Sequence, residues 1–186
     1  MAVQVARRMF STDEFHRMVG AGILAEDDRV ELIEGEIVRM SPIGSRHAAC
    51  VDRLTALFTR RLGRRAIVRV QSPVVLGRRS EPQPDLAILK PRGDYYADKH
   101  PGASDVLLIV EVIESSGEFD RATKVPLYAR AGILEVWLID LPGEAIEIYR
   151  EPTLRSYQAK ARVVRGRRVS PAAFPRMALR VSEIVA

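Results

Sequence analysis

The chain has 186 residues, of which 47% are hydrophobic and 28% are charged, and this size and composition fit one globular domain. Its single cysteine excludes an internal disulfide and a multi-cysteine zinc site, which favours a reducing compartment. No run approaches the roughly eighteen uncharged apolar residues of a membrane span, and arginines interrupt the N-terminus before a signal-type stretch can form. These features predict a cytoplasmic protein that does not cross a membrane.

The net charge is +5, and 25 of the 29 basic residues are arginine. Arginine suits phosphate because its fork of N–H donors matches the phosphate oxygens, so the bias is compatible with a nucleic-acid ligand. Genome composition or growth temperature produces the same bias, and a solvated surface explains it equally well.

A short helix and a β-hairpin are the first predicted elements. The segment Ser11–Glu14 has the pattern of a capping box, and the helix that it starts should end by Gly22. Apolar residues alternate in Arg29–Met40 on both sides of Glu34–Gly35, which predicts two strands and a tight turn. Residues 1–28 are therefore expected to form an N-terminal helical segment of the domain.

The period changes from two to helical over Ser45–Leu62, and Gly63 is the natural end of this predicted helix. His47 lies on the apolar side of its first turn, so it should face the interior. The positive end of the helix dipole disfavours the protonated form of a histidine at that position.

Three short strands are predicted next, at Ala66–Val70, Val74–Leu76 and Asp85–Leu89. The longer run Val106–Ile113 is apolar on both faces apart from Glu111. This pattern is typical of a central strand that is covered on both sides.

A helix is expected over Arg121–Ala131, followed by a second doubly apolar strand at Leu134–Asp140. The order strand, helix, strand predicts a crossover that joins two parallel neighbours. Because a proline inside a helix clashes with the preceding turn, Pro126 requires the helix to start near Ala122 or to kink.

The C-terminal part should add antiparallel edge strands at Ala145–Tyr149 and Ser156–Val164 and a tail over residues 171–186. The tail is expected to pack on the body through its apolar residues, which are Phe174, Met177, Leu179, Val181 and Ile184. The predicted architecture is one α/β (α+β) domain, residues 1–186, with a central mixed β-sheet flanked by helices.

Asp85 and Glu111 are acids in segments that otherwise look like core strands. Burying a lone carboxylate costs several kcal/mol, so each needs a proton, a cationic partner or a metal. If the two strands are adjacent and the faces coincide, the carboxylates meet and repel. A divalent cation resolves this most directly, and oxygen ligands favour magnesium or manganese over zinc.

Lys124 is the candidate basic residue for such a site, since a returning helix could aim it over the strand ends. An Asp and a Glu that hold magnesium beside a lysine suit phosphodiester hydrolysis. The metal lowers the pKa of a bound water, and the lysine orients that water or neutralises the phosphate.

Five segments, taken in order, resemble the Uma-type family of putative restriction endonucleases: ELIEGEIVRMSPIGSRH (31–47), QPDLAIL (83–89), IVEVIESS (109–116), FDRATKVPLYARAG (119–132) and EVWLID (135–140). That family is similar to the PD-(D/E)XK nucleases, whose core runs helix, three strands, helix, strand. The resemblance implies that Asp85 and Glu111 hold Mg²⁺ or Mn²⁺, with the backbone carbonyl of Val112 as a further ligand.

The chain departs from the superfamily pattern at Ile113, where a lysine is expected two residues after the Glu. The resemblance implies Lys124 as a relocated substitute. It also draws attention to Glu31 as a third acid and to His47 as a phosphate or water contact.

Each candidate residue has a plainer interpretation. These are a turn acid for Asp85, an arginine-paired acid for Glu111, a solvated lysine beside Asp120 for Lys124, a satisfied interior histidine for His47, and a surface hairpin acid for Glu31.

The predicted function is a magnesium-dependent endonuclease that acts on DNA. The alternative is a nucleic-acid-binding or protein-interaction module on the same fold that no longer cuts, and Ile113 favours it. By analogy with nucleases that cut both strands, a symmetric homodimer is expected.

Overall fold

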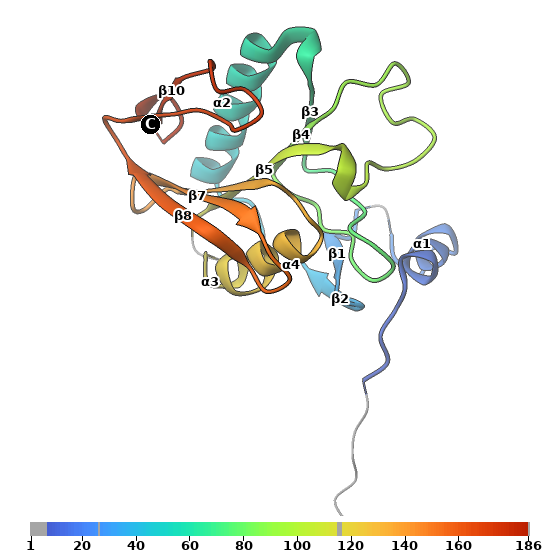
Figure 1. The fold of residues 1–186 in the computed structure, drawn as a ribbon. Coiled ribbons are helices and arrows are strands. Elements are labelled where there is room, and N and C mark those ends of the chain that lie inside the picture. Colours follow the sequence, from blue (N-terminus) through green and yellow to red (C-terminus); the bar gives the residue numbers. More distant parts are fainter. Residues whose placement is uncertain (1–6, 26, 115–116, 186) are drawn as a thin grey trace, which may run out of the picture.

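The structure, a computed structural model, describes residues 7–25, 27–114 and 117–185. Its centre is a six-stranded mixed sheet in the order β3-β4-β5-β6-β7-β8 (Figure 1). The strands are β3 (Ile67–Val70), β4 (Leu86–Leu89), β5 (Val106–Ile113), β6 (Glu135–Asp140), β7 (Ala145–Pro152) and β8 (Tyr157–Val164). Helices flank this sheet, so the predicted α+β architecture is confirmed.

The strands β5 and β6 run parallel, and the other neighbours in the sheet are antiparallel. Every residue of β4 is buried, as is β5 apart from the half-buried Leu107. The predicted central strand and parallel pair are therefore correct. The prediction that both C-terminal strands are edge strands is wrong for β7, because β8 pairs with its outer side.

Two apolar cores cover the two faces of the sheet. The helix α2 (Ser45–Leu62) packs Leu54 and Phe58 against Trp137 of β6 on one face. The C-terminal tail joins the same core through buried residues, as predicted: Met177, Leu179, Val181 and Ile184. On the other face, α4 (Val125–Arg130) buries Tyr128 against β5 and β6.

The hairpin forms as predicted from β1 (Val30–Ile33) and β2 (Glu36–Arg39). Both turn residues have positive φ, 51° at Glu34 and 89° at Gly35, which matches the turn that a two-residue hairpin favours. A side chain at Gly35 would lie 2.7 Å from Cβ of Met9, so this position needs glycine twice over. Before the hairpin, α1 (Thr12–Gly20) begins at the predicted capping box.

The helical segment between β5 and β6 begins earlier than the sequence predicts, at α3 (Gly117–Phe119). It continues as a π-helical turn, Asp120–Lys124, and then as α4. Pro126 near the start of α4 explains the π turn, since it lacks an N–H and crowds the carbonyl four residues back. The proline is therefore accommodated by widening the helix rather than by ending it.

The predicted strand Val74–Leu76 is wrong. Only Val75 forms a β-bridge there, to Gly102, and Pro73 just before it offers no N–H to a ladder. The small remaining sheet pairs β9 (Arg168–Val169) with β10 (Leu179–Arg180). Among the helices of the described residues, none combines the length and hydropathy that a membrane span requires.

Candidate active site

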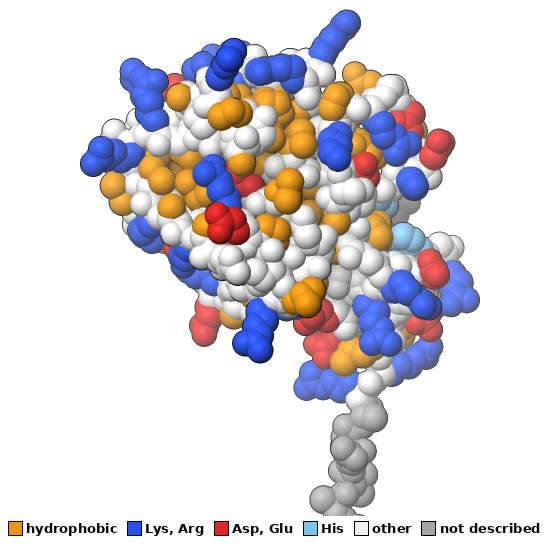
Figure 2. Space-filling model, in the orientation of Figure 1, with side chains coloured by type: hydrophobic (Ala, Val, Ile, Leu, Met, Phe, Trp, Pro, Cys, Tyr) orange, Lys and Arg blue, Asp and Glu red, His pale blue; other side chains and the backbone are white. Residues whose placement is uncertain are grey.

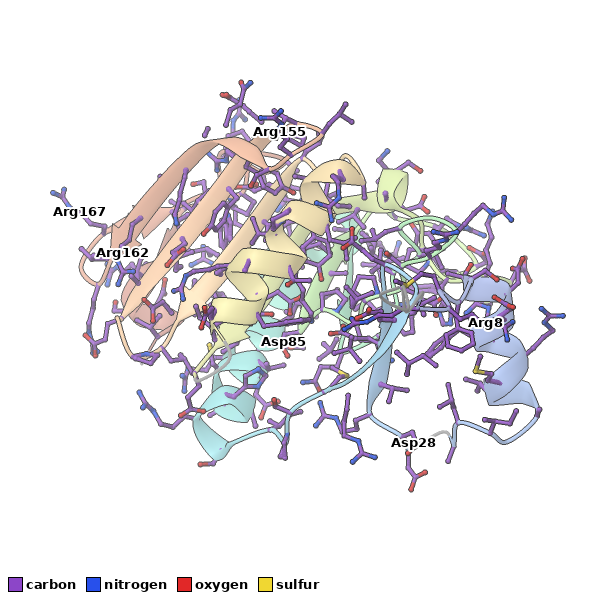
Figure 3. The ribbon with its side chains drawn as sticks, turned by 90° about the horizontal axis from the view of Figure 1, so that it is seen from below. Arg8, Asp28, Asp85, Arg155, Arg162 and Arg167 are labelled. Atoms are coloured by element: carbon purple, nitrogen blue, oxygen red, sulfur yellow. The ribbon has the colours of Figure 1, made fainter. Side chains whose placement is uncertain are left out.

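A cavity of about 250 Å³ lies where β4 begins and β5 ends, and the hairpin, the start of α2 and the π turn form its walls. Its lining contains each residue that the sequence proposes for a site, namely Glu31, His47, Asp85, Glu111, Val112 and Lys124. In Figure 3, Asp85 lies in the middle of the molecule, between α2, the hairpin and the helical segment. The residues that the sequence predicts for a site therefore line one cavity.

The strand register brings Asp85 and Glu111 together. Leu86 pairs with Val110 in the antiparallel β4–β5 ladder, so the residue before β4 lies opposite Glu111. The backbone N–H of Asp85 donates to Glu111 Oε2 at 3.2 Å, and the N–H of Val112 donates to Asp85 Oδ2 at 2.8 Å. Both side chains are buried, so the interpretation of Asp85 as an ordinary turn acid does not fit.

Lys124 reaches this acid pair from the π turn. Its Nζ lies 3.3 Å from Glu111 Oε1 and 3.2 Å from Glu31 Oε2. Lys124 is only 6% exposed and Glu31 only 3%, so the interpretations as a solvated lysine and a surface hairpin acid are both wrong. Burial opposes the charge on Lys124, but Glu111 and Glu31 outweigh it and raise its pKa.

Glu111 is held by a second donor that the sequence analysis missed. Tyr128 Oη, fully buried on α4, donates to Glu111 Oε1 at 2.7 Å. Burial raises the pKa of Glu111 to about 8 against the opposing charge of Lys124, and the nearby Asp85 and Asp120 add to the rise. One lysine is therefore too little positive charge for the acids around it.

His47 lies 3.0 Å from Asp85, between Nε2 and Oδ2. The hydrogen bond to Asp85 raises the pKa of His47 even though burial opposes it, so the expectation from the helix dipole is wrong. Its Nδ1 is buried and has no hydrogen-bond partner among the described residues. The interpretation of His47 as a satisfied interior histidine is therefore wrong as well.

Two further residues donate hydrogen bonds to the acids. Gln71 Nε2, just past β3, donates to Asp85 Oδ1 at 3.2 Å, and the backbone N–H of Gln83 donates to Glu31 Oε2 at 3.1 Å. Tyr128 could have been found from the sequence, because it follows Lys124 by four residues in a helix. Nothing in the sequence marks Gln71, which reaches Asp85 through a backbone turn with φ of 42°.

A second buried acid lies in the same row of the sheet. Leu138 of β6 pairs with Glu111 on one side and with Glu147 of β7 on the other. The π turn serves both acids, since Lys124 contacts Glu111 while Arg121 Nη2 donates to Glu147 Oε1 at 2.7 Å. The two acids therefore differ mainly in what else surrounds them.

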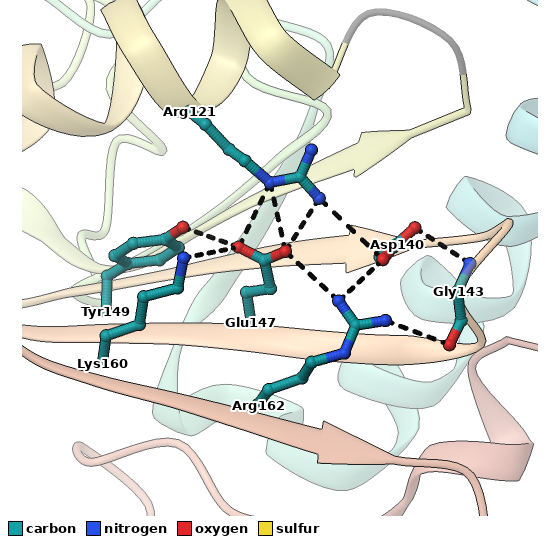
Figure 4. A network of polar contacts seen from close by, with 7 residues as sticks. All are labelled: Arg121, Asp140, Gly143, Glu147, Tyr149, Lys160 and Arg162. Atoms are coloured by element: carbon teal, nitrogen blue, oxygen red, sulfur yellow. Dashed lines mark hydrogen bonds and ion pairs between the residues drawn. The ribbon is translucent and has the colours of Figure 1, made fainter.

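Glu147 lies in a network rich in cations, drawn in Figure 4. Besides Arg121, its carboxylate contacts Lys160 at 3.2 Å, Arg162 at 3.5 Å and the hydroxyl of Tyr149 at 2.6 Å. Burial alone would raise the pKa of Glu147, but these hydrogen bonds outweigh it and lower the pKa to about 2.

The acid pair fits a hard divalent cation. Among the described residues, no three His, Cys, Asp or Glu side chains converge as a ready ligand set, so the protein could supply two carboxylates and the carbonyl of Val112. Magnesium commonly uses one or two carboxylates and keeps several waters. Burial is the main cause of the raised pKa of Glu111, and the nearby Asp85 adds to it, so a bound cation would offset the charge of both carboxylates.

Comparison with known proteins identifies the fold and the family of the chain. The fold matches, over 95% of this chain and 97% of the other, the crystal structure of a putative nuclease belonging to DUF820 from Anabaena variabilis, with a TM-score of 0.72 and 17% identity. The chain thus shares the α+β fold of that protein. The model of the Uma2 family, described as "Putative restriction endonuclease", matches residues 12–182, so the chain belongs to the Uma2 family and the resemblance is confirmed. No curated protein matches the chain.

Proposed function

We propose that the protein is an endonuclease that uses Mg²⁺ or Mn²⁺ to hydrolyse phosphodiester bonds of DNA. One observation carries this proposal. Asp85 before β4, Glu111 on β5 and Lys124 on the π turn converge in one cavity, with contacts of 3.2 and 3.3 Å. Family membership supports a nuclease, and the two buried, adjacent carboxylates of Asp85 and Glu111 support a cation.

In the proposed mechanism, carboxylate oxygens of Asp85 and Glu111 and the carbonyl of Val112 would hold the cation. When bound, the cation would supply a water of lowered pKa and offset charge that develops on the phosphate. Tyr128 and the backbone N–H of Asp85 orient the Glu111 carboxylate through their hydrogen bonds.

Lys124 is the proposed contact for the phosphate or the attacking water. Glu31 holds its ammonium on one side, and the three N–H donors of a lysine leave one beyond the contacts to Glu31 and Glu111. His47 positions Asp85 through its Nε2 and is a further contact for a phosphate oxygen or a water.

Plasmid cleavage tests the proposal. We expect supercoiled DNA to be nicked or linearised with Mg²⁺ or Mn²⁺ and to stay intact in EDTA. Asp85→Asn and Glu111→Gln should abolish cleavage, while Asp98→Asn, an exposed acid outside this cavity, should leave it unchanged. Cleavage that persists equally in Asp85→Asn and Glu111→Gln would reject the assignment.

A second candidate function is a binding module that no longer cuts. Ile113, at the superfamily's lysine position, favours it because this side chain is apolar and only 2% exposed. DNA binding without cleavage under any divalent ion would select this candidate. We also propose a symmetric dimer, and light scattering that shows a monomer with or without DNA would reject it.

A further inference from the structure

The mouth of the cavity carries two arginines that the catalytic proposal does not use. Arg29 directly precedes β1, and Arg39 ends β2 opposite Val30. The backbone N–H of Met40 donates to the carbonyl of Arg29 at 2.8 Å, so the two arginines lie together at the open end of the hairpin. Both line the cavity and both are exposed.

Within the part of the chain that the structure describes, these two arginines have no side-chain partner although acids lie close by. Among the described residues, neither side chain makes a hydrogen bond or ion pair, whereas the acids of the cavity floor contact Lys124, His47, Gln71, Tyr128 or backbone N–H groups. The nearby Glu114 makes a long ion pair with Arg46, with 3.8 Å between Oε1 and Nη1. Their guanidinium groups therefore remain available to a ligand from outside.

The charge of Arg29 reaches into the site. It is one of the charges that act on His47, where it opposes the protonated form. Strand alternation puts Arg29 on the same face of the hairpin as Glu31, the residue that holds Lys124, whereas Arg39, which pairs with Val30, lies on the other face and is also among the residues that line the cavity. A ligand bound by Arg29 would thus lie beside the acid pair.

The distribution of basic side chains over the surface does not by itself identify a binding site. Figure 2 shows Lys and Arg side chains dispersed over one whole face of the molecule, with no single basic stripe. Arg29 and Arg39 differ from the other unpaired arginines because they border a cavity with an acidic floor. An acid pair that can bind a divalent cation, bordered by two arginines, suits an extended polyanion. The guanidinium group of arginine is well matched to phosphate.

We propose that Arg29 and Arg39, the arginine rim, hold the backbone phosphates of a polynucleotide strand next to the phosphodiester that enters the cavity. This inference rests on the proposed function for the place of the cleaved bond. The contacts are to phosphate alone, so the rim contributes affinity and register rather than base specificity.

The test measures binding in EDTA, where no cleavage occurs. Labelled single-stranded DNA, duplex DNA and RNA of one sequence are titrated with the protein at several KCl concentrations, by fluorescence anisotropy. We expect Arg29→Ala and Arg39→Ala each to weaken binding about fivefold and to reduce the slope of log K against log salt by about 1. Arg29→Lys should keep the slope, and comparison of the three ligands shows which polynucleotide the rim prefers.

Arg155→Ala is the matched control, because Arg155 is exposed, makes no side-chain hydrogen bond or ion pair among the described residues and lies far from Asp85 in Figure 3. It should lose little affinity. The proposal is overturned if the wild type binds none of the ligands, or if Arg29→Ala/Arg39→Ala changes affinity and slope no more than Arg155→Ala. If binding depends on the two arginines but no cleavage is found with Mg²⁺ or Mn²⁺, the arginine rim is supported and the nuclease proposal is rejected. If DNA is cleaved but binding does not depend on the two arginines, the nuclease proposal is supported and the arginine rim is rejected.

Discussion

Glu111 and Glu147 are buried acids in one row of the same sheet, separated by Leu138, and one π-helical turn supplies a cation to each. Their surroundings nevertheless drive them in opposite directions. The pKa of Glu111 is raised to about 8 and that of Glu147 is lowered to about 2. The difference shows that burial alone does not make an acid functional; the balance of charge around it does.

At Glu147, three cations converge on one carboxylate, with Asp140 as a second acid nearby. At Glu111, one lysine is shared with Glu31, while Asp120 and Asp85, which His47 contacts, lie close. The charge of Glu147 is neutralised by side chains of the protein itself, and these ion pairs hold the π turn and β8 to β7. The region around Glu111 is short of positive charge, and we infer that a divalent cation supplies it.

The largest expected effect separates the two regions by metal binding. Mn²⁺ should raise the melting temperature of the wild type and of Glu147→Gln but not of Asp85→Asn or Glu111→Gln. Loss of a metal ligand should also lower cleavage about a thousandfold, since about 4 kcal/mol of charge stabilisation disappears. An equal response of Glu111→Gln and Glu147→Gln to Mn²⁺ would contradict the comparison.

Substituting the two cationic residues of the π turn should sharpen the comparison between Glu111 and Glu147. Lys124→Met leaves Glu111 and Glu31 buried without their lysine and should cost about 3–5 kcal/mol of unfolding free energy. Arg121→Met should cost only about 1–2 kcal/mol, because Lys160 and Arg162 still contact Glu147. Urea denaturation measures both, and Mn²⁺ should restore part of the loss in Lys124→Met alone. Equal losses in the two variants would count against a charge deficit at Glu111.

The pH dependence of stability should have opposite signs at the two acids. Because the pKa of Glu111 rises from 4.5 to about 8 on folding, the folded protein keeps a proton there that the unfolded chain releases, so stability falls as the pH rises between these values. The pKa of Glu147 falls from 4.5 to about 2, so its contribution is present above about pH 4.5 and is lost as the pH drops toward 2.

Denaturation without divalent ions, in the wild type, Glu111→Gln and Glu147→Gln, measures these two slopes. Glu111→Gln should flatten the decline toward alkaline pH, and Glu147→Gln should flatten the decline toward acid. If the two substitutions exchange these effects, the assignment of the two environments is wrong.

The smallest expected effect concerns the tyrosines. Tyr128→Phe removes the hydroxyl that orients Glu111 and should weaken Mn²⁺ binding about tenfold, as measured by calorimetry. Tyr149→Phe removes the matching hydrogen bond to Glu147 and should leave Mn²⁺ affinity unchanged. Equal Mn²⁺ affinity in both variants would show that Tyr128 does not contribute to metal binding.

The same comparison shows how far the sequence can predict a site. Glu135 in LEVWLI and Glu147 in AIEIY have the same pattern as Glu111, a single acid in an apolar stretch. Glu135 is fully buried, yet it is neutralised by Arg150 and hydrogen-bonded by Trp137. The pattern therefore predicts a buried acid, but it does not say which cation reaches the carboxylate, and only the fold identifies that partner.

Periodicity and caps predicted the hairpin, α2, β5 and β6, because these depend on local patterns. The expected return of a helix over the strand ends, together with the family resemblance, indicates Lys124. Its route to the site, a π turn forced by Pro126, has no local signal beyond the proline. The protonation of His47 was mispredicted because the helix dipole is local, whereas the Asp85 hydrogen bond that outweighs it spans 38 positions of sequence.

A crystal soaked in Mn²⁺ and measured for anomalous scattering tests the charge deficit most directly. The account predicts one strong peak about 2.1–2.3 Å from carboxylate oxygens of both Asp85 and Glu111, and no peak at Glu147. An empty acid pair at saturating Mn²⁺, or a peak beside Glu147 instead, would contradict it.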